Sequence, residues 1–180
     1  MTTTRDLAAL GFREGDVKAF QAAWALGPPL AVDGVAGPKT IAALKLSLER
    51  RAGGRADLSE HFSGRELVCK CGGRYAGCRR LWVRRELLAA LEVIRAKHGP
   101  VTIRSGCRCA GHNRAVGGAR YSQHLDGRAA DLVSPLLAVS TVRRLKVAHG
   151  IGYSRSSGRV LHVDVRPGVS PSTPTVWVYA

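Results

Sequence analysis

Three residues in the second half of the chain, His124, Asp131 and His162, have side chains that suit a metal ion. Asp131 falls within the apolar run 129–133, where a carboxylate is costly to bury unless it is paired or bound to a metal. Two imidazoles and one carboxylate, with a fourth position open, form a common catalytic zinc site. The spacing alone also fits two ordinary histidines and a capping or salt-bridged acid, so the zinc site is a hypothesis at this point.

The segment 160–165 predicts a strand whose two faces differ in chemistry. Alternation along a strand puts His162 and Asp164 on one face and leaves apolar residues on the other, namely Leu161, Val163 and Val165. An apolar face suits a sheet packed on a core, and two neighbouring ionisable residues suit the wall of a cleft. We therefore expect His162 and Asp164 to line a functional cleft.

The elements that must position these residues include both helices and strands. Apolar residues at helical spacing among Arg and Glu predict a helix over 82–98, which Gly99 and Pro100 end. A further helix is expected over 139–148, and strands are expected over 101–105, 129–133 and 160–165. Because the helices and strands do not repeat regularly, the pattern predicts an α+β fold with a central, mostly antiparallel sheet and flanking helices.

The first 52 residues predict a separate small helical domain. Asp16 can cap a helix over 17–26, and Pro38 suits the first turn of a second helix that continues over 40–48. We expect a three-helix bundle over residues 1–52, a flexible linker at 53–57, and the metal-binding domain over 58–180.

Composition and charge narrow the classes of partner. Lys and Arg number 28 against 13 acidic residues, and the formal net charge of +15 attracts polyanions such as nucleic acids, anionic wall polymers or membrane surfaces. We expect no nucleic-acid role, because the sequence lacks DNA-binding motifs and aromatic residues make up only 6%. No apolar stretch is long enough to span a bilayer, and the N-terminus lacks the pattern of a secretory signal. We expect a monomer that is made in the cytoplasm.

Five cysteines fall in two groups, one at Cys69, Cys71 and Cys78 and the other at Cys107 and Cys109. An odd number leaves at least one thiol unpaired if disulfides form within the chain. The Cys-x-Cys spacing differs from the Cys-x-x-Cys of common structural zinc sites. The sequence leaves reduced thiols, late disulfides and a second metal site open, and it disfavours a catalytic cysteine.

Short motifs spread over residues 58–167 resemble those of one family of zinc peptidases. The segment 122–131 is similar to the S-x-H-x-x-G-x-A-x-D motif of the zinc D-Ala-D-Ala carboxypeptidase-like family. In the order found in that family, 105–108 resembles its S-G-x-R turn, Asn113 follows, and 161–164 resembles its terminal H-V-D strand. The family includes wall endopeptidases and phage endolysins, and it shares its fold with the hedgehog signalling domain.

The resemblance implies a role for several residues that match the motifs. His124, Asp131 and His162 would bind zinc, which lowers the pKa of a bound water toward roughly 7 and polarises the scissile carbonyl. Arg108 matches an arginine that steadies the substrate and the developing oxyanion. Ser122 would orient a substrate carboxylate or a ligand, or it would be only a turn residue.

The general base is less well defined than the metal ligands. The positions that hold the base in relatives are occupied here by Arg159 and Val160, which cannot accept a proton. Asp164 is the nearest acidic candidate, on the same predicted strand face as His162. Asp164 equally fits a group that orients a ligand, and an arrangement with Asp164 as ligand and His162 as base is also open.

The turn residues of segments 31–34 and 37–40 resemble those of the three-helix peptidoglycan-binding module. The alternative is a helical hairpin that binds no ligand. The two resemblances together imply a zinc peptidase of the phage endolysin type. It would bind bacterial peptidoglycan and cut its stem peptides or cross-links at the cell wall. A D-Ala-D-Ala carboxypeptidase and a non-catalytic, zinc-containing wall-binding protein are the alternatives.

Overall fold

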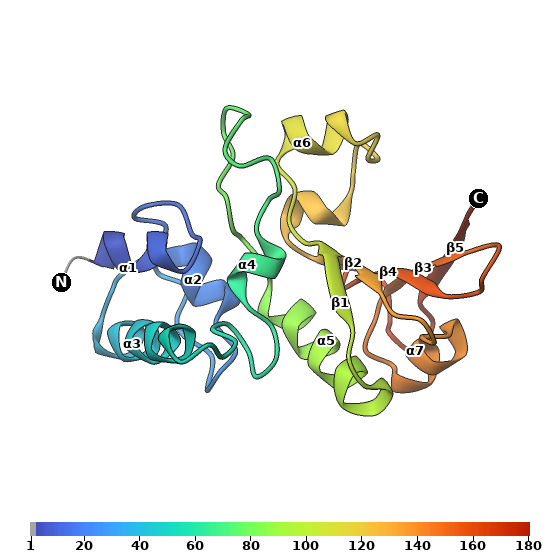
Figure 1. Cartoon of the computed structure of the whole chain (residues 1–180), viewed down its shortest axis with the longest axis horizontal. Helices are drawn as coiled ribbons and strands as arrows, with labels where there is room; N and C mark the ends of the chain where they lie inside the picture. Colours follow the sequence, from blue (N-terminus) through green and yellow to red (C-terminus); the bar gives the residue numbers. More distant parts are fainter. Residues whose placement is uncertain (1–2) are drawn as a thin grey trace.

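The computed structural model describes residues 3–180 and has its N-terminal helices at one end and a β-sheet at the other (Figure 1). The helices are α1 (Thr3–Ala9), α2 (Val17–Ala23), α3 (Pro38–Ala52), α4 (Gly64–Leu67), α5 (Arg85–His98), α6 (Ala110–Ala115), the 3₁₀ helix η1 (Gln123–Asp126) and α7 (Val139–Leu145). The strands are β1 (Thr102–Ser105), β2 (Ala129–Val133), β3 (Gly150–Ser154), β4 (Val160–Asp164) and β5 (Thr175–Tyr179). The predicted α+β class is confirmed. No helix among residues 3–180 is long and apolar enough to cross a membrane.

The five strands found in residues 3–180 form one sheet in the order β1-β2-β4-β3-β5. β3 and β5 are parallel, and the other neighbouring pairs are antiparallel. In the ladder between β2 and β4, Asp131 lies opposite His162, and Ala129 lies opposite Asp164. Side chains of directly opposed residues lie about 5 Å apart on one face of a sheet. This register therefore brings two of the predicted metal ligands together.

A hydrophobic core joins the sheet to the helices that cover it. α5 has its buried leucines and isoleucine at helical spacing, at positions Leu87, Leu88, Leu91 and Ile94. Buried residues of the sheet belong to the same cluster, among them Ala130, Leu132, Ile151 and Val163. α7 packs against both α5 and β3. The sheet is thus supported on its apolar side, and its other side is left to form a site.

The N-terminal helices pack against the rest of the chain through α2 and α5. As predicted, Asp16 caps α2, because its side chain accepts a hydrogen bond from the backbone N–H of Ala19 at 3.1 Å. The guanidinium of Arg85 donates to the backbone oxygens of Trp24 and Gly27 at 2.7 and 2.8 Å. Buried residues of α1, α2 and α3 belong to the same hydrophobic cluster as those of α5. A separate three-helix bundle therefore stays a prediction.

The predicted linker, 53–57, is fixed to the fold at its C-terminal end. Asp57 is buried, and its Oδ1 accepts a hydrogen bond from the backbone N–H of Gly64 at 2.8 Å. Arg50 Nε donates to the backbone oxygen of Ala56 at 2.6 Å. The division of the chain into domains at this segment stays a prediction.

The turn that resembles the peptidoglycan-binding module is held by one buried side chain, Gln21. Its Nε2 donates to Asp33 Oδ1 at 2.8 Å and lies 3.1 Å from Thr40 Oγ1. Its Oε1 accepts a hydrogen bond from the backbone N–H of Gly34 at 2.9 Å, and the φ of +85° at this glycine suits a residue without a Cβ. Asp33, Gly34 and Thr40 of the motif therefore stabilise the turn itself.

Two strands, β3 and β5, were not predicted from the sequence. β3 contains two glycines, and β5 has mostly exposed side chains, so neither shows the alternation of a half-buried strand. The expectation that Leu161 packs on the core is wrong, because its side chain is 37% exposed. In the ladder with β3, Gly152 pairs with His162 and Tyr153 pairs with Val160, so Leu161 is the extra residue of a bulge.

Candidate metal centre

β2, β4 and η1 bring His124, Asp131 and His162 together. Asp131 Oδ1 lies 3.1 Å from His124 Nε2 and 3.0 Å from His162 Nδ1, and these two nitrogens are 3.3 Å apart. Zinc bonds to nitrogen and oxygen measure about 2.0–2.1 Å, so ligand atoms at the corners of a tetrahedron lie about 3.3 Å apart. The three atoms are therefore spaced to bind one zinc ion together.

η1 carries His124 and ends at Gly127, which adopts a left-handed conformation with φ of +65°. A Cβ at Gly127 would also collide with the backbone oxygen of Trp82. Only glycine satisfies both conditions without strain. This explains why the motif has glycine three residues after the first histidine. The close contact between Gly127 and Trp82 also fixes η1 against the segment that leads into α5.

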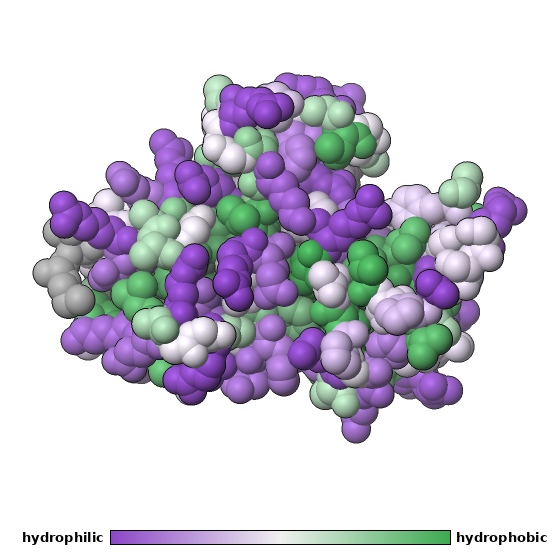
Figure 2. Space-filling view, viewed as in Figure 1, coloured by the Kyte–Doolittle hydropathy of each residue, from purple (hydrophilic) through white to green (hydrophobic). Residues whose placement is uncertain are grey.

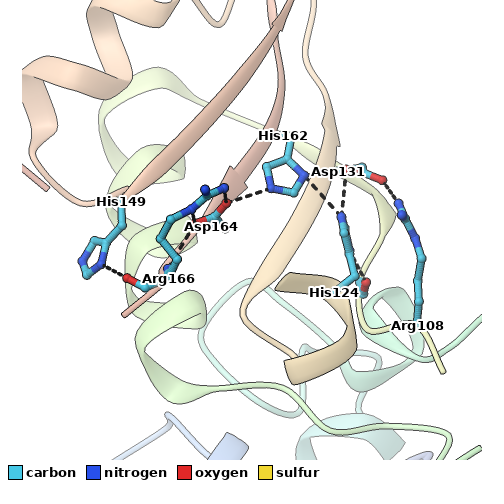
Figure 3. A network of polar contacts seen from close by, with 8 residues as sticks. Arg108, His124, Asp131, His149, His162, Asp164 and Arg166 are labelled. Atoms are coloured by element: carbon cyan, nitrogen blue, oxygen red, sulfur yellow. Dashed lines mark hydrogen bonds and ion pairs between the residues drawn. The ribbon is translucent and has the colours of Figure 1, made fainter. Parts of the chain in front are cut away.

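The second ring nitrogen of each histidine also has a partner (Figure 3). His124 Nδ1 lies 2.6 Å from the backbone oxygen of Gly106, and His162 Nε2 lies 3.2 Å from Asp164 Oδ2. When each of these nitrogens donates a proton to its oxygen, His124 Nε2 and His162 Nδ1 are left with lone pairs that face Asp131. Hydrogen bonds of this kind are typical of zinc-binding histidines.

The other carboxylate oxygen of Asp131, Oδ2, forms an ion pair with Arg108. Arg108 Nε also donates to Ser105 Oγ at 2.9 Å, and the Arg108 side chain is only 14% exposed. The two contacts fix the guanidinium beside the carboxylate and leave Oδ1 to face the histidines. Arg108 is thus adjacent to the three candidate ligands, and its expected role with the substrate stays a prediction.

Burial and hydrogen bonding set the protonation of this cluster. Burial raises the pKa of Asp131, but hydrogen bonds with His124 and His162 outweigh it and hold the pKa well below its usual range. Burial likewise raises the pKa of Asp164, and the hydrogen bonds from Arg166 and His162 again outweigh it. For His162, burial lowers the pKa, but hydrogen bonds with Asp131 and Asp164 raise it above its usual value. Two ionised carboxylates at neutral pH favour the binding of a cation.

Asp164, the base candidate of the sequence, lies behind His162 and away from the three clustered ligand atoms. It is fully buried, and its two oxygens accept hydrogen bonds from the Arg166 side chain as well as contacting His162 Nε2. A Cβ at Gly150 would collide with this carboxylate, so the glycine of β3 makes room for it. These contacts favour Asp164 as the residue that orients His162. They favour Asp131 as the carboxylate that would bind the metal together with the two histidines.

A cleft of about 910 Å³ opens over the three ligands. Its walls come from β4, β5 and the loop that contains Ser122. Figure 2 shows that the outline is hollowed between the lobe that contains α6 and the end of β5. Three arginines line the cleft, at positions 104, 108 and 166, against two carboxylates, Asp131 and Asp164, among the described lining residues. The excess of positive charge favours a ligand that carries carboxylates.

Sequence patterns did not identify Arg166, Trp177 or Tyr179 as residues of the cleft. Trp177 and Tyr179 lie on β5, and the Trp177 ring centroid is 5.2 Å from that of His162. The Arg166 guanidinium carbon lies 4.9 Å from the centroid of the Trp177 ring. The run T-V-W-V-Y near the C-terminus consists of β-branched and aromatic residues, which favour strands, and this composition is the signal that could have indicated the aromatic wall.

Comparison with known proteins supports a hydrolytic metal centre. A family model described as Peptidase M15 matches residues 60–164, more than half of the chain. The matched range includes His124, Asp131 and His162, and it ends before β5. A comparison with curated proteins gives no match.

Proposed function

Because this chain belongs to the peptidase M15 family, we propose that it is a zinc peptidase that hydrolyses peptide bonds in bacterial peptidoglycan. The observation that carries the proposal is the spacing of 3.0–3.3 Å among Asp131 Oδ1, His124 Nε2 and His162 Nδ1 at the base of an arginine-rich cleft. A zinc ion held there acts as a Lewis acid on a carbonyl oxygen and makes water a stronger nucleophile near neutral pH.

The charge of the cleft supports a substrate with free carboxylates, such as the stem peptide of peptidoglycan. Arg104, Arg108 and Arg166 line the cleft, and a guanidinium pairs well with a carboxylate because it offers two parallel donors. Arg166 already uses two of its donors on Asp164, so Arg104 and Arg108 are the arginines that we assign to the substrate. Arg108 is the arginine closest to the ligands, so it is the one we assign to the substrate carbonyl and its developing negative charge. Ser122, in a loop that lines the cleft, is assigned to a substrate carboxylate.

The endolysin role is the more specific part of the proposal. A net charge of +15 draws the protein toward anionic wall polymers, and an endolysin made in the cytoplasm would reach the wall once the membrane is breached. The same arginines also suit the terminal carboxylate of a D-Ala-D-Ala stem, which keeps a carboxypeptidase as the second candidate.

A test of the activity uses purified sacculi and the full chain loaded with zinc. We expect wild type to clear the sacculi in a zymogram and His124→Ala to leave them intact. Mass spectrometry of the released fragments distinguishes an endopeptidase, which frees cross-linked stems, from a carboxypeptidase, which frees D-alanine alone. Zinc-loaded wild type that releases no fragment would favour the non-catalytic, wall-binding alternative.

We also propose that the N-terminal turn contacts the wall. Two apolar side chains on it, Val32 and Val35, are 53% and 63% exposed, although neighbouring residues of the turn are held by Gln21. Co-sedimentation with sacculi, in the inactive His124→Ala background, should weaken with Val35→Asp. The matched control is Val93→Asp, at a 38% exposed apolar position on α5. Equal binding by both variants would argue against a wall-binding turn.

A further inference from the structure

A second cluster of side chains that can bind a metal consists of Cys69, Cys71, Cys78 and Cys109. It is separate from the site of His124, Asp131 and His162, which we call the M15 centre. The Sγ atom of Cys71 lies 3.6 Å from that of Cys69, 3.4 Å from that of Cys78 and 3.8 Å from that of Cys109. All four sulfur atoms lie within 4.8 Å of one another. Residues up to 40 positions apart in the sequence thus converge on one point.

The distances between the sulfur atoms distinguish a metal site from disulfides. A disulfide needs its two sulfur atoms about 2.05 Å apart. Zinc–sulfur bonds measure about 2.3 Å, so the four sulfur atoms of a tetrahedral site lie about 3.8 Å apart. The observed separations of 3.4–3.8 Å match the edges of such a tetrahedron.

The surroundings of the cluster suit thiolates. The backbone N–H of Cys109 donates to Cys69 Sγ at 3.3 Å, and the backbone N–H of His112 donates to Cys109 Sγ at 3.4 Å. His112 Nδ1 also lies 3.4 Å from Cys69 Sγ. Hydrogen bonds from N–H groups favour the charged form of the sulfur, which is the form that binds metals.

The fifth cysteine, Cys107, is outside this cluster and provides an internal comparison. It is 1% exposed, and its thiol lies 3.1 Å from the backbone oxygen of Leu67, to which it donates. The odd number of cysteines therefore resolves into four potential ligands and one ordinary buried thiol.

We propose that Cys69, Cys71, Cys78 and Cys109 bind a structural zinc ion. Four thiolates close the coordination shell and leave no position for water or substrate, which is characteristic of structural zinc and excludes a catalytic role for this ion. The inference does not depend on the activity proposed for the M15 centre, because no ligand is shared between the two.

The second zinc would fasten the loop 69–78 to the start of α6. This loop projects beside α6 in Figure 1. A Cβ at Gly111 would collide with the Tyr75 side chain, so the loop and the helix already pack closely without a metal. Cys109 is the N-cap of α6 and directly follows Arg108, whose guanidinium pairs with Asp131. The zinc would therefore act as a positioning element that holds Arg108 beside the catalytic ligands.

The first measurement uses wild-type full-length protein, purified under reducing conditions. We expect elemental analysis to find two zinc ions per chain. A mercurial reagent that attacks thiolates should release one of them, and the other should remain until a strong chelator is added. Wild type with a single zinc that the mercurial does not release would overturn the proposal, as would a disulfide within the four cysteines or iron in place of zinc.

Variants then assign each zinc to its ligands. Cys71→Ser should lower the zinc content by one ion and remove the thiolate-to-metal absorption bands that cobalt-substituted protein shows in the near ultraviolet. Cys107→Ser is the matched control, because it removes a buried thiol outside the cluster and should keep both ions and the bands. His124→Ala should lose the other zinc and keep the cobalt–thiolate bands. Retention of those bands in Cys71→Ser would contradict the assignment, and the wild-type mercurial titration decides the matter even if that variant fails to fold.

Discussion

Asp164 Oδ2 contacts the Nε2 atom of His162 at 3.2 Å, on the opposite side of the imidazole ring from the Nδ1 atom that faces Asp131. The aspartate is fully buried and lies behind the ring, whereas Asp131 is adjacent to the metal-facing nitrogens of both histidines. The contact holds the ring with its metal-facing lone pair directed at the site. Asp164 in this position would control metal binding through His162 and would not touch the metal itself.

Asp164→Asn should weaken zinc binding at the M15 centre by about 10–100-fold, because the histidine loses the anion that orients it and strengthens it as a ligand. Competition with a chelating dye measures the affinity, and hydrolysis of sacculi at saturating zinc measures the activity. We expect most of the activity to return at saturating zinc. Unchanged zinc affinity with activity lost at saturation would instead identify Asp164 as the general base.

His124→Ala and Asp131→Ala should each remove the zinc ion of the M15 centre and abolish hydrolysis, because two ligands are too few to hold the ion. Asp131→Ala should lower the stability of the fold more than His124→Ala, because Asp131 also pairs with the buried Arg108. Without Asp131, the charge of Arg108 is buried without a partner. Thermal unfolding compares the two variants. Full zinc content in either variant would show that the ligands have been assigned wrongly.

Arg108→Lys should lower kcat by about 100-fold, because the lysine keeps the charge but loses the forked geometry that contacts Asp131 and Ser105. Zinc content should stay close to that of wild type. If zinc affinity falls in parallel with kcat, Arg108 acts by holding Asp131, and it has no separate role with the substrate.

Zinc binding at the M15 centre should weaken as the pH falls. The weakening should begin at a higher pH than it would if the histidine ligands had the usual histidine pKa. A metal ligand must lose its proton, and hydrogen bonds with Asp131 and Asp164 hold the pKa of His162 above 6.5 despite burial. Protonation of His162 therefore competes with zinc from a pH above 6.5 downward. Affinity measured between about pH 5 and 8 checks this, and a flat profile over that range would contradict it.

Trp177→Ala should raise KM for stem-peptide substrates several-fold and leave the zinc content unchanged, because the ring forms part of the cleft wall beside His162 but is not a ligand. Trp177→Phe should recover most of the loss, since it keeps an aromatic surface at the same place. A change in kcat at constant KM would show that Trp177 acts on His162 itself.

The sequence alone determined the chemistry of the candidate site. Side chains that bind zinc are of few types, and His124, Asp131 and His162 stood in motifs whose glycine, alanine and arginine positions also matched. Regular elements with strong periodicity were predicted as well: β2 was correct at both ends, and α5 began three residues later than expected and ended where predicted, at His98. These features depend on local sequence, because hydrophobic spacing and turn residues act over a few positions.

Only the tertiary structure decided which groups meet. The pairing of β2 with β4 sets Asp131 opposite His162, and it places Asp164 behind the ring, so that the orienting role is favoured over the proton-transfer role. Trp177 reaches the cleft because β5 runs parallel to β3, a long-range pairing that leaves little periodic signal in an exposed edge strand. In the same way, Cys69 and Cys109 are 40 residues apart in the sequence but in contact in space, with a backbone N–H of one donating to the sulfur of the other. Contacts between distant segments arise from the packing of the whole chain, and no local pattern of residues encodes them.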